Sequence, residues 1–297
     1  MSKFILSCES TVDLPYKKVV DRNLPVLFYT YVVDGVEYID DMGKEEDSIP
    51  NFYRMLDDGK MPSTSQINVF RYTEFFEKLL EENEGDICHI AFGSGLTPSV
   101  NNAKEAAEAL NEKNPDRKIV VIDTLCGSSG YGLFVEILAD MRDDGKTMEE
   151  IVEWAEKNKS KMHHQFFSTD MKFFKRSGRV SGPVATVASI LGICPIMHLD
   201  HTGHIIAYNK VRGKKAAIEA TVKEMLANAE NGNDYTGKCY ISNSNCLDLA
   251  NETASAIKAA FPKIGSVEIF DIGTIIASHC GPGTVAVFFM GNERKPT

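Results

Sequence analysis

The chain has 297 residues, 43% of them apolar and 25% charged, which is the balance of an ordinary folded protein rather than a disordered or fibrous one. At about 150 residues per domain, this length predicts two domains. Acidic residues outnumber basic ones by 42 to 32, and the formal charge of −10 repels nucleic-acid phosphates and anionic membranes. The charge therefore argues against nucleic acid as a partner and leaves transient membrane contact at most.

The cysteines and the first residues bear on where the protein works. Seven cysteines are scattered along the chain without CxxC spacing, which is typical of a reducing compartment. The opening MSKFILSCEST lacks the apolar stretch and the cleavage site of a signal peptide. The longest apolar stretch, residues 183–197, is shorter than the roughly twenty residues that span a bilayer. We therefore expect a cytoplasmic protein without a transmembrane helix.

Short apolar runs alternate with helical patterns in the first half of the chain. Strands are predicted at residues 4–7, 26–33, 87–91 and 119–122, and helices at residues 69–80, 99–112 and 148–159. This alternation favours a largely parallel sheet covered by helices on both faces, because parallel neighbours need a crossover. Ligands bind such sheets at the carboxyl ends of the strands.

The pattern changes after residue 159. A strand is predicted at residues 164–168, a helix around Phe173 and Phe174, and a hairpin turn at residues 200–203. Further strands are predicted at residues 238–242, 267–272 and 284–290, and further helices at residues 214–228 and 248–261. We therefore predict a two-domain α/β fold, with an N-terminal α/β/α domain at residues 1–162, a smaller C-terminal α/β domain at 163–297, and a ligand cleft between them.

Hydroxyl and amide side chains gather at residues 62–66, Pro-Ser-Thr-Ser-Gln, just before the predicted helix at residues 69–80. Side-chain and free backbone donors at a helix N-terminus favour an anion. Thr64 and Ser65 are therefore candidate anion-binding residues. The alternative, which the sequence alone favours, is a plain helix cap.

The loop at residues 92–97, Phe-Gly-Ser-Gly-Leu-Thr, connects a predicted strand to a predicted helix. Ser94 and Gly95 would aim a hydroxyl and backbone N–H groups at one point, as the second half of the same anion site. A serine-hydrolase elbow would read GxSxG, whereas here the glycines flank Ser94 directly, which argues against a hydrolase. The alternative is a flexible turn without a ligand.

His279 stands in a segment shaped by glycine and proline, Ser-His-Cys-Gly-Pro-Gly, which we interpret as a loop between two strands. A histidine there can donate to a carboxylate and adjust its charge to it. The alternative is a structural histidine bonded to a carbonyl.

Basic residues and a histidine triplet suggest two further sites. Arg179 and Arg212 each adjoin a glycine and suit a phosphate or an acidic partner surface, although a solvated charged face would look the same. His198, His201 and His204 are spaced by three, but residues three apart on a strand face opposite sides. We therefore predict no metal site.

The ordered set of loops points to one family over essentially the whole chain. The sequence resembles the DegV-family fatty-acid-binding proteins, the lipid-carrying subunits of the bacterial fatty acid kinase. The landmarks are residues 9–15 (ESTVDLP), 36–40 (VEYID), 64–66 (TSQ), 94–96 (SGL), 177–179 (SGR), 210–213 (KVRG) and 279–283 (HCGPG).

The resemblance implies a fatty acid threaded into the larger N-terminal domain, with its carboxylate near the domain interface. Thr64, Ser94 and His279 would bind the carboxylate, together with Ser65 and Gly95 of the same loops. Arg179 and Arg212 would lie at the mouth, facing the kinase or the phosphate it delivers. The chain itself would not be an enzyme and would need no cofactor: a separate ATP-dependent kinase would make the acyl phosphate, and an acyltransferase would consume it.

The sequence departs from the family pattern at four positions. Glu9 stands where the family usually has Asp, Gly93 where it often has Ser, Pro98 where Gly is common, and Cys194 where Lys is frequent. Gly93 and Pro98 predict a differently shaped loop around Ser94. Cys194 belongs to the apolar stretch at residues 183–197, which we interpret as part of a lid or core over the cleft.

Two other functions stay open at the level of sequence. One is a small hydrolase or phosphotransferase that uses Ser94 and His279 in the same cleft and turns over without a partner. The other is a lipid sensor or scaffold with an apolar pocket. The chain lacks a GxxxxGK[ST] loop, so we do not expect it to hold ATP itself.

Overall fold

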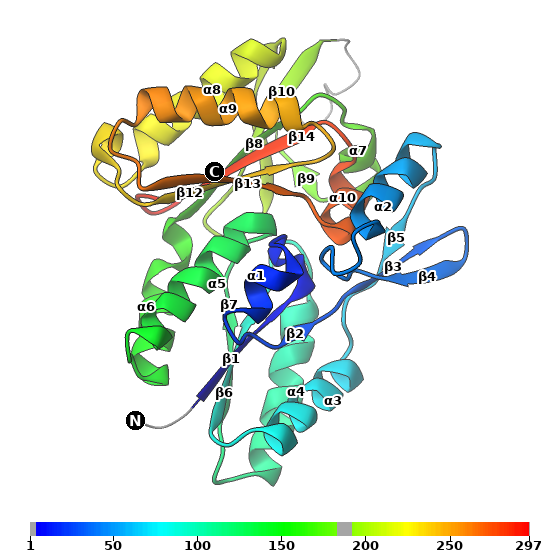
Figure 1. The fold of residues 1–297 in the computed structure, drawn as a ribbon, viewed down its shortest axis with the longest axis vertical. Coiled ribbons are helices and arrows are strands. Elements are labelled where there is room, and N and C mark those ends of the chain that lie inside the picture. The colour runs from blue at the N-terminus through cyan, green and yellow to red at the C-terminus, as the bar shows by residue number, and fades with distance from the viewer. Residues whose placement is uncertain (1–3, 183–191, 297) are drawn as a thin grey trace.

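The first sheet is parallel and forms the core of the lower body of the molecule (Figure 1). The computed structural model describes residues 4–182 and 192–296. In sheet order, the strands are β2 (Val26–Leu27), β1 (Phe4–Glu9), β6 (Asp86–Ala91) and β7 (Ile119–Asp123). The interior of β6 is wholly buried, as expected for a parallel strand covered on both faces. Predicted strands at residues 4–7, 87–91 and 119–122 are confirmed.

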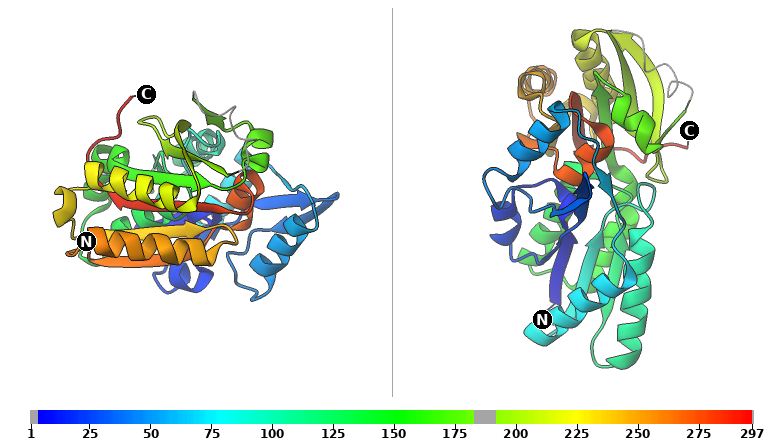
Figure 2. Two further views of the ribbon diagram at one scale, coloured as in Figure 1. Left: turned by 90° about the horizontal axis from the view of Figure 1, so that it is seen from above. Right: turned by 90° about the vertical axis from the view of Figure 1, so that its right-hand side faces the viewer.

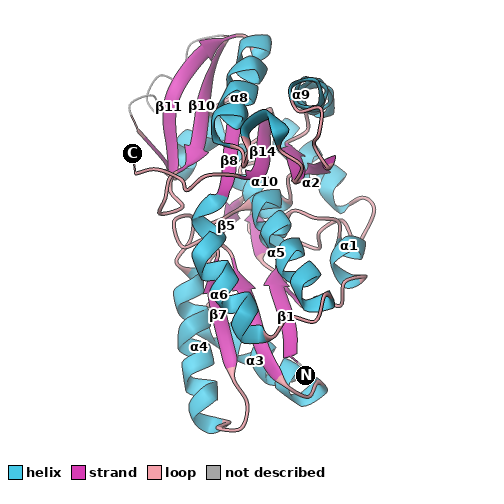
Figure 3. Cartoon of the chain, turned by 90° about the vertical axis from the view of Figure 1, so that its left-hand side faces the viewer, coloured by secondary structure: helices cyan, strands magenta, loops and turns pink. Residues whose placement is uncertain are grey.

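Helices cover this sheet and confirm the predicted α/β alternation. They are α1 (Tyr16–Val20), α3 (Val69–Glu82), α4 (Ser99–Lys113), α5 (Ser128–Asp143) and α6 (Met148–Asn158). The chain reaches α6 through a capping box, in which the Thr147 side chain accepts from the Glu150 N–H and the Glu150 side chain accepts from the Thr147 N–H. Figure 3 shows these helices around the lower strands, seen from the side.

The single strand predicted at residues 26–33 is wrong. The chain leaves the first sheet after β2 and enters a small antiparallel sheet of β3 (Thr30–Val33), β4 (Val36–Ile39) and β5 (Ser63–Thr64), flanked by α2 (Ser48–Asp57). Tyr29 lies at the break, where its N–H donates to Ser10 Oγ at 3.1 Å and its carbonyl accepts from the Asp40 N–H at 3.0 Å. These partners take the place of ladder bonds that a continuous strand would make.

The second sheet is mixed and forms the upper body (Figures 1 and 2). In sheet order, its strands are β13 (Ser266–Asp271), β12 (Lys238–Asn243), β14 (Thr284–Met290), β8 (Met162–Ser168), β10 (Ile193–Leu199), β11 (Ile205–Arg212) and β9 (Val180–Ser181). Its helices are α7 (Lys172–Ser177), α8 (Lys214–Asn228), α9 (Leu247–Ala260) and α10 (Thr274–Cys280). The predicted hairpin at residues 200–203 is confirmed and joins β10 to β11.

The two faces of the second sheet belong to different apolar cores. Phe166 and Phe288 pack into the large core that also fills the first sheet, whereas Phe167 and Val287 pack beneath α8 and α9. Successive side chains on a strand point to opposite faces, so one face of the second sheet closes over the carboxyl edge of the first. Because this core is continuous, the division at residues 162 and 163 stays a prediction.

The apolar stretch at residues 183–197 is described only in part. Residues 183–191 lie outside the described residues. Cys194 is buried on β10 and packs in the smaller core beneath α8 and α9, on the side of the sheet away from the first sheet. Among the described helices, none has the length and apolar content to cross a membrane.

Candidate functional site

A cavity of about 330 Å³ lies where the second sheet covers the carboxyl edge of the first. The lining comes from three loops of the first sheet, from β5, from α7 and α10, and from the covering strands. It consists of Tyr29, Thr64, Ser65, Gln66, Phe92, Leu96, Thr97, Pro98, Gly127, Ser128, His164, Phe166, Phe174, Ser177, Arg179, Leu199, Ile205, Ile272, Ile275, Ile276, His279, Cys280, Thr284, Ala286 and Phe288. Most of these side chains are apolar. The cavity thus suits a largely apolar ligand with a polar group at one end.

Thr64 and His279 form the polar pair of the cavity. Thr64 lies on β5, opposite Tyr31 of β3, and His279 lies in the last turn of α10. Thr64 Oγ1 and His279 Nε2 are 2.7 Å apart, and both residues are half-buried. The structure thus brings these two predicted site residues together. What they bind stays a prediction.

Burial, together with the positive charges of Arg179 and Arg176, lowers the pKa of His279 to about 4. The imidazole is therefore neutral at pH 7. An incoming carboxylate would find a ring N–H and a hydroxyl together, beside an arginine at the mouth. This arrangement is suited to an anionic headgroup.

The loop predicted around His279 is in fact the short helix α10. It begins after Gly273 and ends at Gly281, whose positive φ of 65° is the left-handed conformation that favours glycine. The Thr274 hydroxyl donates to Asp40 Oδ1 at 2.9 Å and so fixes the start of the helix. Sequence patterns missed α10 because seven residues are too few to show a helical period.

Arg176 holds the two halves of the polar pair together. One nitrogen of its guanidinium, Nη2, donates to the carbonyl of Pro62, just before β5, and at 3.3 Å to the carbonyl of Ser278 in α10. The backbone segments that carry Thr64 and His279 are thus tied to one side chain. Nothing in the sequence around Arg176 predicts this role, because its two carbonyl partners are distant along the chain.

The predicted helix cap at residues 64–66 is wrong. Asn68 caps α3 instead, and its Oδ1 accepts from the Arg71 N–H at 3.0 Å. Thr64 belongs to a strand, and Ser65 follows it as an exposed residue at the cavity wall. The free donors of a helix N-terminus are therefore not what this segment offers.

Ser94 and Gly95 do not line the cavity. Ser94 is exposed, and its N–H donates to Asp123 Oδ1 at 3.0 Å. A Cβ on Gly95 would lie 2.3 Å from the backbone of Gly203, so this turn is pressed against the β10–β11 hairpin. The expectation that Ser94 points at the anion site is wrong, and Thr97 of the same loop lines the cavity instead.

The shape of this loop follows from Gly93. Its N–H donates to the Cys126 carbonyl at 2.9 Å, and a Cβ on Gly93 would lie 2.6 Å from the Cys126 nitrogen. A serine at this position would clash with the neighbouring loop. The expected effect of Gly93 on the loop is thus explained by its contact with the residues after β7.

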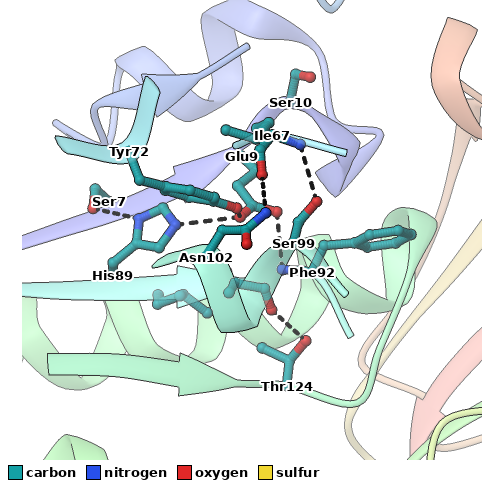
Figure 4. A network of polar contacts seen from close by, with 12 residues as sticks. Ser7, Glu9, Ser10, Ile67, Tyr72, His89, Phe92, Ser99, Asn102 and Thr124 are labelled. Carbon is teal, nitrogen blue, oxygen red and sulfur yellow. Dashed lines mark hydrogen bonds and ion pairs between the residues drawn. The ribbon is translucent and has the colours of Figure 1, made fainter. Parts of the chain in front are cut away.

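Glu9 ends β1 and is wholly buried, and Figure 4 shows it among its hydrogen-bond partners. Its carboxylate accepts from the Tyr72 hydroxyl, from the Phe92 N–H at 3.0 Å and from His89 Nε2 at 3.3 Å. His89 in turn accepts a hydrogen bond from the Ser7 hydroxyl at 2.9 Å. This Glu9 cluster fixes Phe92 at the cavity wall, and its polar groups are paired with one another.

The two arginines predicted at the mouth lie far apart. Arg179 is exposed and lines the cavity. Arg212 ends β11, seven residues beyond Ile205, which lines the cavity, and at about 3.3 Å per residue that is roughly 23 Å along the strand. The expectation that Arg212 lies at the mouth is therefore wrong.

The histidine triplet shows no metal-binding arrangement. The ring centroids of His198 and Tyr208 are 4.6 Å apart, and His204 Nδ1 lies 2.8 Å from the Thr202 hydroxyl. In residues 4–182 and 192–296, no three His, Cys, Asp or Glu side chains are placed to hold a metal ion.

Comparison with known sequences gives matches over the whole chain. The family model described as "Uncharacterised protein, DegV family" matches residues 3–292. The DegV domain-containing protein CPE0026 of Clostridium perfringens is 36% identical over 296 residues, 100% of each chain. The DegV domain-containing protein YteA of Lactococcus lactis is 30% identical over 294 residues, 98% of this chain and 99% of its own.

Solved structures share the fold. A DegV lipid binding protein from Thermotoga maritima superposes with a TM-score of 0.86 at 24% identity, over 99% of this chain and 100% of its own. The fatty acid kinase B3 protein of Streptococcus pneumoniae, loaded with linoleic acid, superposes with a TM-score of 0.82 at 21% identity, over 98% and 100%. By its sequence and its fold, this chain belongs to the DegV family.

Proposed function

We propose that the chain binds a long-chain fatty acid in the cavity, with the carboxylate held between Thr64 and His279. The observation that carries this proposal is the polar pair of Thr64 and His279, 2.7 Å apart, in the wall of a cavity lined mostly by apolar side chains. A fatty acid has the matching chemistry, one carboxylate on one long apolar chain. Structures with this fold include one from Thermus thermophilus described by its fatty acid binding.

The energetics favour such a ligand. Each methylene moved from water into an apolar site contributes about 0.8 kcal/mol, so an acyl chain of about sixteen carbons contributes about 12 kcal/mol before the costs of association. A buried carboxylate without hydrogen bonds would offset much of this gain. Thr64 and His279 supply the donors that prevent that loss.

We further propose that the chain presents the carboxylate to an ATP-dependent kinase and is not itself the catalyst. The Streptococcus pneumoniae relative is named for a fatty acid kinase, which supports this role. Arg179 stands exposed at the cavity wall, where its guanidinium can stabilise a phosphate delivered to the carboxylate. Arg212 would serve only as a more distant docking contact, and an acyltransferase would consume the acyl phosphate.

The alternative hydrolase or phosphotransferase is disfavoured by the position of Ser94. A nucleophile must lie within hydrogen-bonding reach of its base. His279 lines the cavity, whereas Ser94 is exposed outside it and bonded through its backbone to Asp123. The two residues named for that chemistry do not meet.

Fatty acid binding is tested by titrating delipidated protein with a saturated fatty acid and with the primary alcohol of the same chain length. We expect tight binding of the acid and much weaker binding of the alcohol, because the alcohol lacks the carboxylate that the polar pair would hold. Equal affinities would show that Thr64 and His279 do not hold the headgroup. No binding of either would rule out the proposed function.

The role of Arg179 is tested by acyl-phosphate formation with a partner fatty acid kinase and labelled ATP. Arg179→Ala should lower the rate even at saturating kinase, while fatty acid affinity stays unchanged. Arg212→Ala is the matched control, since it removes an exposed arginine roughly 23 Å along β11 from the cavity. It should at most raise the kinase concentration needed, and equal rate losses in both variants would overturn the assignment.

A further inference from the structure

The order of strands in the first sheet indicates from which edge of the sheet each lining residue enters the cavity wall. Tyr29 follows β2, Phe92 follows β6 and Gly127 follows β7, and all three line the cavity. Thr64 lies beside the β2 edge, because β5 pairs with β3, which continues the chain from β2. Three interstrand spacings of about 4.8 Å separate β7 from β2 by roughly 14 Å. The segment from β7 to α5, which carries Gly127, therefore enters the cavity lining from the edge of the sheet opposite to the polar pair.

Beside Gly127 the cavity is lined by His164, and neither ring nitrogen of this histidine is free to bond to a ligand. The Gly127 N–H donates to His164 Nε2 at 3.1 Å, and His164 Nδ1 donates to the Met162 carbonyl at 3.1 Å. Both ring nitrogens are thereby used, and burial holds the pKa of His164 well below its usual value, so the ring is neutral. Leu96, Phe92 and Phe288 complete a part of the wall suited to a terminal methyl group.

Gly127 is where an added atom would change the cavity. A Cβ there would lie 2.6 Å from Leu96 Cδ1 and 2.9 Å from Phe92 Cε2, and both side chains line the cavity. The backbone of Gly127 is extended, with φ −148° and ψ 167°, so alanine fits its conformation. The conflict is therefore with the two side chains alone.

The backbone behind Gly127 has little freedom to retreat. The Leu125 carbonyl accepts two bonds from the Arg294 guanidinium, each at 3.1 Å, and the Cys126 carbonyl accepts from the Gly93 N–H at 2.9 Å. Phe92 is also held in place, since its N–H donates to Glu9. Leu96 is only half-buried and is the side chain that can move. An added methyl group at residue 127 would therefore displace Leu96 at the cavity wall.

We propose that Gly127 and Leu96 together determine the longest acyl chain that the cavity accepts. The proposal rests on the fatty acid binding proposed above and adds its specificity. Because residue 127 has no Cβ, the Leu96 side chain can pack against the backbone of Gly127. The cavity space that this leaves open would hold the last carbons of the acyl chain.

The test is an affinity series of saturated fatty acids of increasing length on delipidated protein. For the protein without substitutions, affinity should rise about fourfold per added methylene until the acyl chain fills the cavity. Beyond this length, the breakpoint, affinity should stop rising. Gly127→Ala should move that breakpoint to shorter chains, and Leu96→Ala to longer ones. The double variant should return the breakpoint toward its original length, because the added methyl group then has space.

Leu80→Ala is the matched control, since Leu80 is a half-buried leucine packed on the same core but absent from the cavity lining. It should leave the breakpoint unchanged. If Gly127→Ala does not fold, Leu96→Ala alone decides. If neither variant moves the breakpoint, the proposal is overturned while fatty acid binding stands. If the protein without substitutions binds no fatty acid of any length, the proposed function itself is ruled out.

Discussion

Two polar groups of side chains lie at the carboxyl edge of the first sheet, and they differ in how fully the protein satisfies them. Glu9 is wholly buried, and Tyr72, His89 and the Phe92 N–H all bond to its carboxylate. Thr64 and His279 are half-buried, and within residues 4–182 and 192–296 their side chains bond to each other alone. Polar groups that the fold already pairs stabilise the fold, whereas a pair at a cavity wall with donors to spare can bind a ligand.

Removing the Glu9 carboxylate should have the largest effect, and it should fall on stability. Glu9→Ala leaves the partners of a buried carboxylate unpaired, which costs about 1–3 kcal/mol in the free energy of unfolding for each donor left unsatisfied. Urea denaturation measures this loss. Glu9→Asp keeps the charge and should lose less. A change below about 1 kcal/mol for Glu9→Ala would mean that the cluster is not a structural element.

Removing the imidazole of His279 should act on binding instead. A hydrogen bond to a charged group contributes about 1.5–3 kcal/mol, so His279→Ala should weaken fatty acid binding by about 10- to 100-fold. The affinity of the matching fatty alcohol should change much less. Calorimetric titration of both ligands makes the comparison. Equal losses for acid and alcohol would show that the substitution damages the cavity rather than the headgroup site.

Removing the hydroxyl of Thr64 should also weaken fatty acid binding, by a smaller factor than removing the imidazole of His279. Thr64→Val keeps the shape of the side chain and removes the hydroxyl. Its single proton can bond either to the carboxylate or to His279 Nε2, so its net contribution is that of an ordinary hydrogen bond, about 0.5–1.5 kcal/mol. Fatty acid affinity should fall by about two- to tenfold. The Ser63→Ala variant, on the neighbouring residue of β5, is the control and should leave affinity unchanged, because Ser63 does not line the cavity.

The pH dependence of stability comes last, because His279 and Asp40 share it with other buried groups whose pKa values are shifted, His163, His164 and Asp13 among them. The pKa of His279 falls from 6.5 to about 4, so the stability it contributes is lost as pH falls from about 6.5 to about 4. Burial raises the pKa of Asp40 from 3.8 to about 6, so its contribution is lost as pH rises through the same range. We therefore expect the difference in urea midpoint between each variant, His279→Asn or Asp40→Asn, and the protein without substitutions to change with pH in opposite directions across this range. Slopes of the same sign would contradict the assignment.

Local patterns in the sequence predicted much of the fold and half of the candidate site. The strands around residues 87–91 and 119–122 and the helix at 99–112 follow from apolar runs and periodicity, which are local. Thr64 and His279 stood out because they adjoin turn-forming residues. Each of these features can be seen within a few residues of sequence.

The errors arise where distant segments decide the outcome. Ser94 turns outward because Gly95 is pressed against Gly203, more than a hundred residues away. The break at Tyr29 depends on Ser10 and Asp40, and the position of Arg212 depends on which end of β11 faces the cavity. Gly127 had no signal in the sequence, since its importance lies in the absence of a Cβ beside Leu96.

The most direct test of the account is native mass spectrometry of the purified chain, followed by identification of whatever small molecule it releases. We expect a mass increment of one long-chain fatty acid per protein chain, and loss of most of that increment in His279→Ala but not in the Leu80→Ala control. A chain that carries no lipid, and that takes up no fatty acid when the acid is supplied in excess, would contradict it.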